Sequence, residues 1–200
     1  MGWLAALPDL VTAAGLLLVW LRPDLTGTAW VGRGVATVLL EFFVIHAGGF
    51  FAVVLFGGAP RLKRSLYLGG LAALYLPLVA AYAWAMHAWW MVGAFLWLGF
   101  TKVQAVWGGR VDEDRERKQW AAMVTWAASV VAYLGAVCAS AFVDWPEFGV
   151  TPAVRAAAGF SGGGLWEAHP HTALAGGVLY FCAMALVRML VRDLMFRSKS

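Results

Sequence analysis

Long apolar stretches alternate with short polar segments along almost the whole chain. A helix that crosses a bilayer needs about 20 consecutive, mostly apolar residues. Six stretches meet that length within the usual error of helix boundaries, over about residues 3–21, 35–57, 65–86, 88–107, 119–143 and 172–191. The pattern therefore predicts an all-α protein, a polytopic integral membrane helix bundle of about six transmembrane helices that forms one domain over residues 1–200.

The boundaries of some spans depend on a few residues. Pro8 and Asp9 interrupt the first stretch close to its start, which makes it the least regular of the six. The third and fourth stretches are separated only by the residues around His87. A single helix of more than about 40 residues would be much longer than the hydrocarbon core is thick. We therefore expect a tight helical hairpin at His87.

The longest loop, residues 144–171, carries the signals of a short helix. Thr151 followed by Pro152 is typical of a helix start, and Gly159 is typical of a helix end. These signals predict a short interfacial helix over PAVRAAA. Pro170 suits the first turn of the last span.

Composition supports a membrane protein. With 62% hydrophobic and 13% charged residues, the chain has more apolar surface than one soluble core of this length can bury. The lipid bilayer is therefore the expected partner of the chain. The formal net charge of +4 could indicate nucleic-acid binding, but the basic residues form short clusters between apolar stretches. They form no continuous basic face, so nucleic acid is not an expected partner.

The basic clusters predict the topology, because lysine and arginine concentrate in cytoplasmic loops. Eleven of them fall on one side of the six predicted spans, namely Arg61, Lys63, Arg64, Arg110, Arg115, Arg117, Lys118, Arg188, Arg192, Arg197 and Lys199. Three fall on the other side, namely Arg22, Arg33 and Arg155. The bias predicts cytoplasmic termini and an extracytoplasmic loop 144–171, in a membrane of the bacterial cytoplasmic type. Lys102 and Arg188, inside spans, are expected to extend toward the membrane surface.

Two ionisable residues, Glu41 and His46, lie inside the second apolar stretch. Such a group in the hydrocarbon region costs about 2.5 to 3.5 kcal/mol on insertion scales, so it usually faces the protein interior and has a function. In the predicted topology, Glu41 lies about 9 Å and His46 about 16 Å below the outer surface. His87 lies at the outer hairpin, while Glu167, His169 and His171 precede or begin the last span. All six residues map to the outer half of the protein.

Imidazole and carboxylate groups together can bind a transition metal or transfer protons. The six residues are therefore the candidate site for a metal ion, protons or other ions. Their spacing is not diagnostic, since Glu41 and His46 are turned about 140° from each other on a helix and no HExxH motif occurs. The competing interpretation is structural. In it, Glu41 is protonated and bonds to Tyr82 or Tyr180, and the loop histidines are solvated.

Other cofactors and activities find less support in the sequence. A b-type haem between helices needs paired histidines, and only His46 lies well inside a span. Cys138 and Cys182 form no CxxC pair or metal-ligand spacing. No recognised catalytic motif occurs, and the sequence leaves open whether the protein is an enzyme.

A second function class does not require a polar site. The chain has no soluble domain, and its glycine and aromatic residues suit contacts between membrane helices. It could therefore be a non-catalytic structural or assembly subunit of a larger membrane complex, with other subunits or copies of itself as partners.

Overall fold

The computed structural model describes residues 3–108, 114–160 and 162–197, and side chains as far as residue 194. Every regular element in these ranges is a helix. In chain order they are α1 (Trp3–Leu21), α2 (Pro23–Thr26), α3 (Ala29–Leu55), α4 (Arg61–Ala85), α5 (Trp90–Trp107), α6 (Arg115–Phe142), α7 (Pro152–Ala157), α8 (Leu165–Ala168) and α9 (Pro170–Arg197). These ranges contain no strand. The predicted all-α fold is confirmed.

Within the same ranges, five helices are long and apolar enough to cross a membrane: α1, α3, α4, α6 and α9. They make the chain a multi-pass integral membrane protein. The remaining predicted span, 88–107, forms the 18-residue helix α5 but is not among these five. Its carboxyl half carries Lys102 and Gln104, which lower its mean hydropathy.

The second span is longer than the sequence pattern indicates. Its helix, α3, begins at Ala29, six residues before the predicted start. The sequence GRG over residues 32–34 resembles the end of a loop, but glycine is well tolerated in membrane helices. Phe42 is consequently the middle residue of α3. Glu41 precedes that midpoint by one residue, and His46 follows it by four.

The chain divides into two compact units. Unit 1 comprises residues 1–38 and 128–200, and unit 2 comprises residues 39–127. The boundaries fall inside α3 and α6, so each of these helices contributes one segment to each unit.

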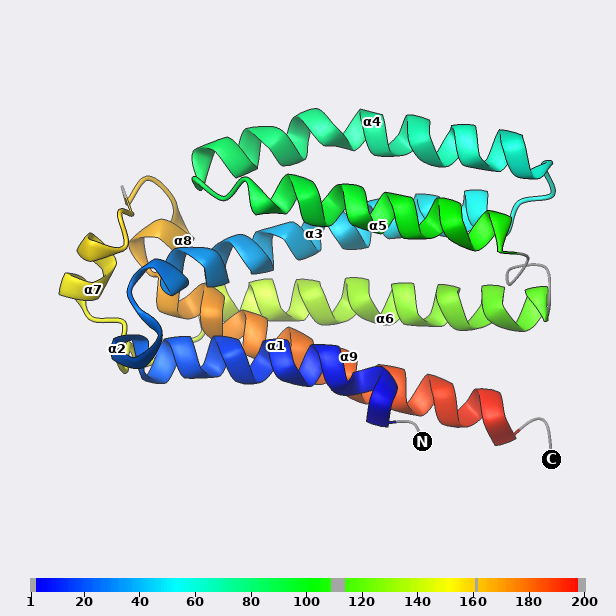
Figure 1. The fold of residues 1–200 in the computed structure, drawn as a ribbon. Helices are drawn as coiled ribbons and strands as arrows, with labels where there is room; N and C mark the ends of the chain where they lie inside the picture. The colour runs from blue at the N-terminus through cyan, green and yellow to red at the C-terminus, as the bar shows by residue number, and fades with distance from the viewer. Residues whose placement is uncertain (1–2, 109–113, 161, 198–200) are drawn as a thin grey trace. The chain divides into compact units, whose positions relative to one another are not determined.

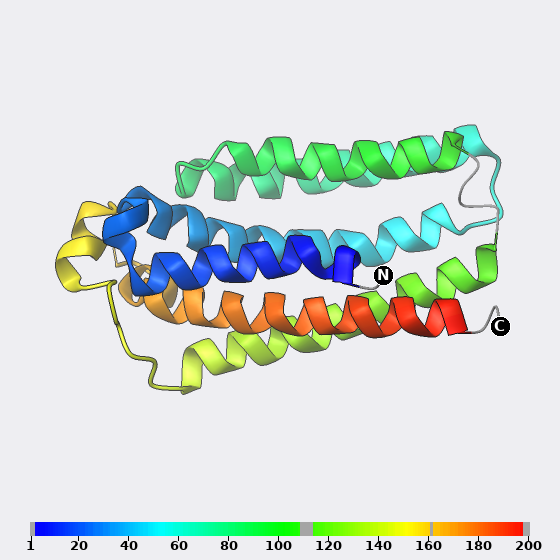
Figure 2. The ribbon, with the colours of Figure 1, turned by 60° about the horizontal axis from the view of Figure 1, so that its bottom comes forward.

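In unit 1, α1 and α9 pack side by side in opposite directions (Figures 1 and 2). The close packing of α9 against Leu16 of α1 and Val38 of α3 depends on Gly177. A Cβ atom at Gly177 would lie 2.8 Å from Leu16 Cδ1 and 2.6 Å from Val38 Cγ2. Tyr133 of α6 donates to the carbonyl oxygen of Val38 at 3.1 Å. The amino end of α1 and the carboxyl end of α9 lie at the same end of this unit (Figure 1).

The loop that follows α6 is attached to the opposite end of α1. The Trp20 indole donates to the Pro146 carbonyl oxygen at 3.0 Å and packs edge to face against Phe148. Farther along, the predicted interfacial helix is present as α7, and the Thr151 hydroxyl accepts from the Val154 amide at 3.4 Å. Gly159, just after this helix, has a φ of +80°, which glycine adopts at little cost.

In unit 2, α4 and α5 form the predicted hairpin. His87 lies in its turn with a φ of +48°, in the left-handed region. At the other end of α4, the buried Arg64 donates to the Leu55 carbonyl oxygen at 3.0 Å. Arg115 of α6 donates to the Phe56 carbonyl oxygen. Two arginines thus bind carbonyl groups at the carboxyl end of α3, where a helix favours positive charge.

Candidate functional site

The six candidate residues fall into both units. Glu41, His46 and His87 belong to unit 2, whereas Glu167, His169 and His171 belong to unit 1. Over the part of the chain that the structure describes, no three His, Cys, Asp or Glu side chains come together in a group that could hold a metal ion. Metal binding by these residues stays a prediction.

The best-defined polar contact at a predicted site residue joins His46 to Tyr75. The Tyr75 hydroxyl lies 2.6 Å from His46 Nδ1. Tyr75, on α4, is only 7% exposed, whereas the His46 ring is exposed on α3. In the tautomer in which the Tyr75 phenol donates to Nδ1, the neutral imidazole carries its proton on Nε2. In that tautomer His46 presents an N–H donor on the side of the ring opposite Tyr75.

Aromatic rings fix the orientation of this imidazole. Phe42 stacks on His46 with ring centroids 6.0 Å apart and planes 4° from parallel. Phe50 and Tyr75 each contact the imidazole edge to face at 5.6 Å. Residues 42, 46 and 50 are four apart on α3, so they form one stripe along the helix. Tyr75 in turn packs against Phe95 of α5 at 6.1 Å.

His46 lines a cavity of about 340 Å³ whose walls come from α3 and α6. Phe50, Val53 and Phe56 form much of the α3 side, and Met123 and Trp126 much of the α6 side. Gln119 is the second polar side chain in the lining. Val53 and Met123 are 74% and 57% exposed, so the cavity opens at the surface of the helices.

A glycine and a tryptophan set the shape of this cavity. The Trp126 indole donates to the Ile45 carbonyl oxygen at 3.0 Å. Its ring lies directly against Gly49, where a Cβ atom would be 2.8 Å from the indole Nε1 and Cε2. Any larger residue at position 49 would displace the indole. The cavity wall beside His46 therefore requires a glycine at position 49, because only a residue without a side chain leaves room for the indole.

The other two unit 2 candidates have different surroundings. Glu41 is half-buried on α3 and takes part in an interaction of its own. His87 is exposed in the α4–α5 turn and is not part of the cavity lining. Tyr82, which the structural interpretation offers as a partner for Glu41, packs edge to face against Phe43 at 5.2 Å.

In unit 1, His169 and His171 do come together at the start of α9. Their ring centroids are 5.8 Å apart, with the planes nearly perpendicular. His171 is buried at 6% exposure, while His169 is exposed. The carboxylates of Glu147 and Asp144 in the preceding loop also interact electrostatically with the buried His171 ring. The structure thus groups two of the predicted histidines but directs only one of them to solvent.

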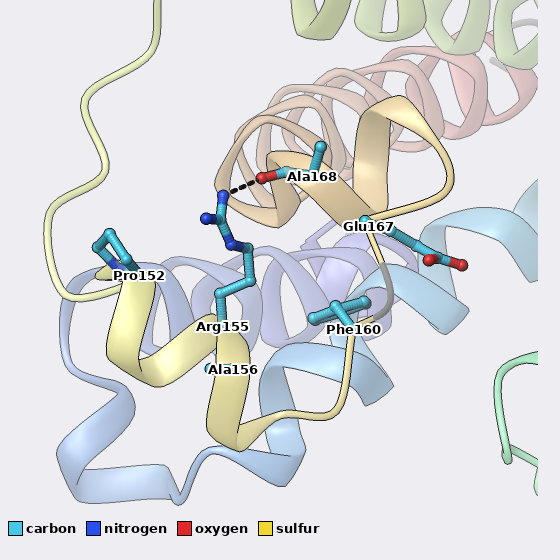
Figure 3. A pocket seen from close by; sticks show the side chains of 7 residues that line it. Pro152, Arg155, Ala156, Phe160, Glu167 and Ala168 are labelled. Carbon is cyan, nitrogen blue, oxygen red and sulfur yellow. Dashed lines mark hydrogen bonds between the residues drawn. The ribbon is translucent and has the colours of Figure 1, made fainter.

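Glu167 lines a separate pocket of about 300 Å³ between α7 and α8 (Figure 3). Arg155 of α7 donates to the Ala168 carbonyl oxygen at the end of α8, while the Glu167 carboxylate points away from the Arg155 guanidinium (Figure 3). The Glu167 carboxylate instead accepts from the Gly163 amide at 3.2 Å. Both contacts connect parts of the loop to one another, which gives these charged groups a structural role.

One ion pair inside the spans was not predicted from the sequence. Arg188 Nε of α9 lies 2.5 Å from Asp9 Oδ2 of α1. The Asp9 side chain is 8% exposed and the Arg188 side chain 46%. Arg188 was expected to extend toward the membrane surface, but it pairs with a carboxylate on the neighbouring helix. The sequence did carry one indication of this pair, since Asp9 lies in the first predicted span and Arg188 in the last.

No protein family, curated protein or solved structure matches this chain.

Proposed function

We propose that this membrane protein binds a membrane-soluble molecule that accepts a hydrogen bond, in the unit 2 cavity beside His46. One observation carries the proposal. An apolar cavity open at the helix surface contains an imidazole whose other ring nitrogen is occupied by Tyr75 at 2.6 Å. A small-molecule site is typically a mostly apolar cavity of about 300–1,000 Å³ with a few polar groups that orient the ligand.

The lining selects the chemical class of the ligand. Phe50, Val53, Phe56 and Met123 offer only apolar contact. A ligand that reaches this cavity from the bilayer must be largely hydrocarbon or aromatic. The Nε2–H of neutral His46 then selects for a carbonyl or similar acceptor, because a buried polar group without a hydrogen bond is costly. Aromatic carbonyl compounds that dissolve in membranes fit both requirements.

The geometry of the Tyr75 contact is compatible with either protonation state of the His46 ring. In the neutral ring the phenol donates to Nδ1, and in the charged ring Nδ1–H donates to the phenol oxygen. The 2.6 Å contact can therefore persist in both states. Of the six residues predicted to handle protons, we therefore propose His46 alone, because its imidazole would contact the ligand.

Photolabelling tests where such a molecule binds. The purified chain in detergent is irradiated with an aromatic ketone that carries an alkyl diazirine, and the labelled peptides are identified by mass spectrometry. We expect labels on residues 49–56 and 119–126, and competition by the same ketone without the diazirine. Ala52→Trp, which adds a large side chain to the lining, should remove most of the label.

Two results would count against the proposal. Label spread evenly over all the helices would show partition into detergent without a site. Label that stays at residues 49–56 in Ala52→Trp would place the molecule outside the cavity. His169→Phe is the matched control, because this exposed histidine lies in the other unit and should leave the labelling unchanged. A stoichiometric protein that copurifies and covers these peptides would instead favour the subunit hypothesis.

A further inference from the structure

A second cavity lies in unit 1, between α1 and the first part of α3. Its volume is about 410 Å³. Gly15, Leu16 and Val19 line it on α1, and Trp30, Arg33 and Gly34 line it on α3. The lining runs from Thr12 to Val19 along α1, about 10 Å at 1.5 Å per residue. We call this cavity the α1–α3 groove.

The groove has a cationic group beside an otherwise largely apolar lining. The guanidinium of the exposed Arg33 lies 4.8 Å from the centre of the Trp30 ring. Across the described ranges the structure gives Arg33 no carboxylate partner, unlike Arg22, which pairs with Asp24 at 2.8 Å. A guanidinium fits the geometry of a phosphate group, and tryptophan is enriched where lipid headgroups meet the hydrocarbon region.

A buried hydroxyl group in the same groove supplies an independent observation. Thr26 Oγ1 is buried and has no hydrogen-bond partner among the described residues. The other two lining hydroxyls are satisfied, since Thr12 donates to the Pro8 carbonyl oxygen and Thr37 to that of Arg33. Buried polar atoms nearly always have a partner. Thr26 lines the groove, so a polar atom of a bound molecule there would satisfy its hydroxyl group.

From these features we infer that the α1–α3 groove binds one anionic phospholipid. Arg33 binds the phosphate, Thr26 bonds to an oxygen of the phosphate or glycerol ester region, and an acyl chain lies along Gly15, Leu16 and Val19. A free phosphate ion would not use the apolar part of the groove. A lipid with a net neutral headgroup would gain less from Arg33, because its own cation already neutralises its phosphate.

Native mass spectrometry of the full chain tests the inference. The protein in detergent is titrated with phosphatidylglycerol or with phosphatidylcholine that carries the same acyl chains. We expect one tightly retained lipid per chain, with phosphatidylglycerol favoured by about threefold or more, as a charge-assisted contact would give. Arg33→Gln should reduce phosphatidylglycerol to the level of phosphatidylcholine, while Thr26→Val should weaken its binding about twofold or more.

Control variants separate this site from general lipid binding. Arg22→Gln removes a nearby arginine outside the groove and should preserve the preference. Gly15→Leu places a large side chain in the groove, where a Cβ atom at Gly15 meets nothing within 4 Å, and should lower retention of both lipids. The inference is overturned if Arg33→Gln keeps the preference, if Gly15→Leu leaves retention unchanged, or if millimolar inorganic phosphate displaces the lipid.

Discussion

The Tyr75 hydroxyl lies 2.6 Å from His46 Nδ1 and joins the middle of α4 to α3. This contact provides a hydrogen-bond partner for His46, the imidazole inside the second apolar stretch. An imidazole in an apolar helix is costly unless its nitrogens are bonded. Tyr75 satisfies one nitrogen, and the cavity beside His46 offers a place where a ligand can satisfy the other.

Tyr75→Phe tests the state of the imidazole. Loss of the hydroxyl should reduce the free energy of unfolding by about 0.6–1 kcal/mol, the usual range for one hydrogen bond between membrane helices. The ¹⁵N NMR resonance of His46 Nδ1 should shift as its hydrogen bond is lost. Tyr82→Phe is the matched control on the same helix, and it should leave that resonance in place. An unchanged Nδ1 resonance in Tyr75→Phe would rule out the contact.

Gly49→Ala tests the cavity wall. Its Cβ atom would lie 2.8 Å from the Trp126 indole, so the indole has to move and its bond to Ile45 is strained. We expect a loss of about 1–3 kcal/mol, typical of overpacking, in thermal unfolding in detergent. Gly48→Ala is the control, because a Cβ atom there meets nothing within 4 Å. Equal stability of the two variants would contradict the described packing.

A double-mutant cycle on Asp9 and Arg188 tests the ion pair between α1 and α9. Asp9→Asn and Arg188→Gln should each destabilise unit 1, and the double variant should lose less than the sum of the two. We expect a coupling energy of about 1 kcal/mol, between the values for exposed and buried pairs, because Arg188 is partly exposed. Additive losses in chemical unfolding would show that the two side chains act independently.

The pair formed by Arg22 and Asp24 predicts a pH dependence in the connection between α1 and α3. The hydrogen bond from the Arg22 guanidinium holds the pKa of Asp24 below its ordinary value of 3.8. The contribution of this ion pair to the free energy of unfolding is thus complete above the pKa of Asp24 in the unfolded chain. It is lost as the pH falls through the lowered pKa of Asp24 in the folded chain. Arg22→Gln should raise the pKa of Asp24, as measured by ¹³C NMR of its carboxyl carbon. A pKa that does not rise would exclude the pair in solution.

The helices could be predicted from the sequence because hydrophobic length is a local property. The hairpin at His87 and the helix after Thr151 likewise depend on neighbouring residues. The start of α3 was predicted six residues late, because the helix continues through Gly32, Arg33 and Gly34, which precede the apolar stretch. Such errors arise where a membrane helix tolerates residues that interrupt soluble ones.

The site could be predicted only in part, because side-chain partners depend on how the helices pack. His46 was identified from its position in an apolar stretch, but Tyr75 lies on another helix and no sequence spacing connects the two. Asp9 and Arg188 lie near opposite ends of the chain and meet only because α1 and α9 are neighbours. The stripe of Phe42, His46 and Phe50 follows from an i, i+4 spacing but was not among the sequence predictions.

The most direct measurement compares the binding of two ligands to the wild-type protein and to His46→Phe. The ligands are an aromatic ketone and the hydrocarbon of the same shape that lacks the carbonyl oxygen, titrated by isothermal calorimetry in detergent. We predict that the wild type binds the ketone about fivefold more tightly, since one hydrogen bond contributes about 1 kcal/mol. In His46→Phe the preference should vanish, and His46→Gln, which keeps a donor, should restore part of it. Equal affinity of the wild type for the two ligands, or an undiminished preference in His46→Phe, would contradict the assignment of His46 as the ligand's hydrogen-bond donor.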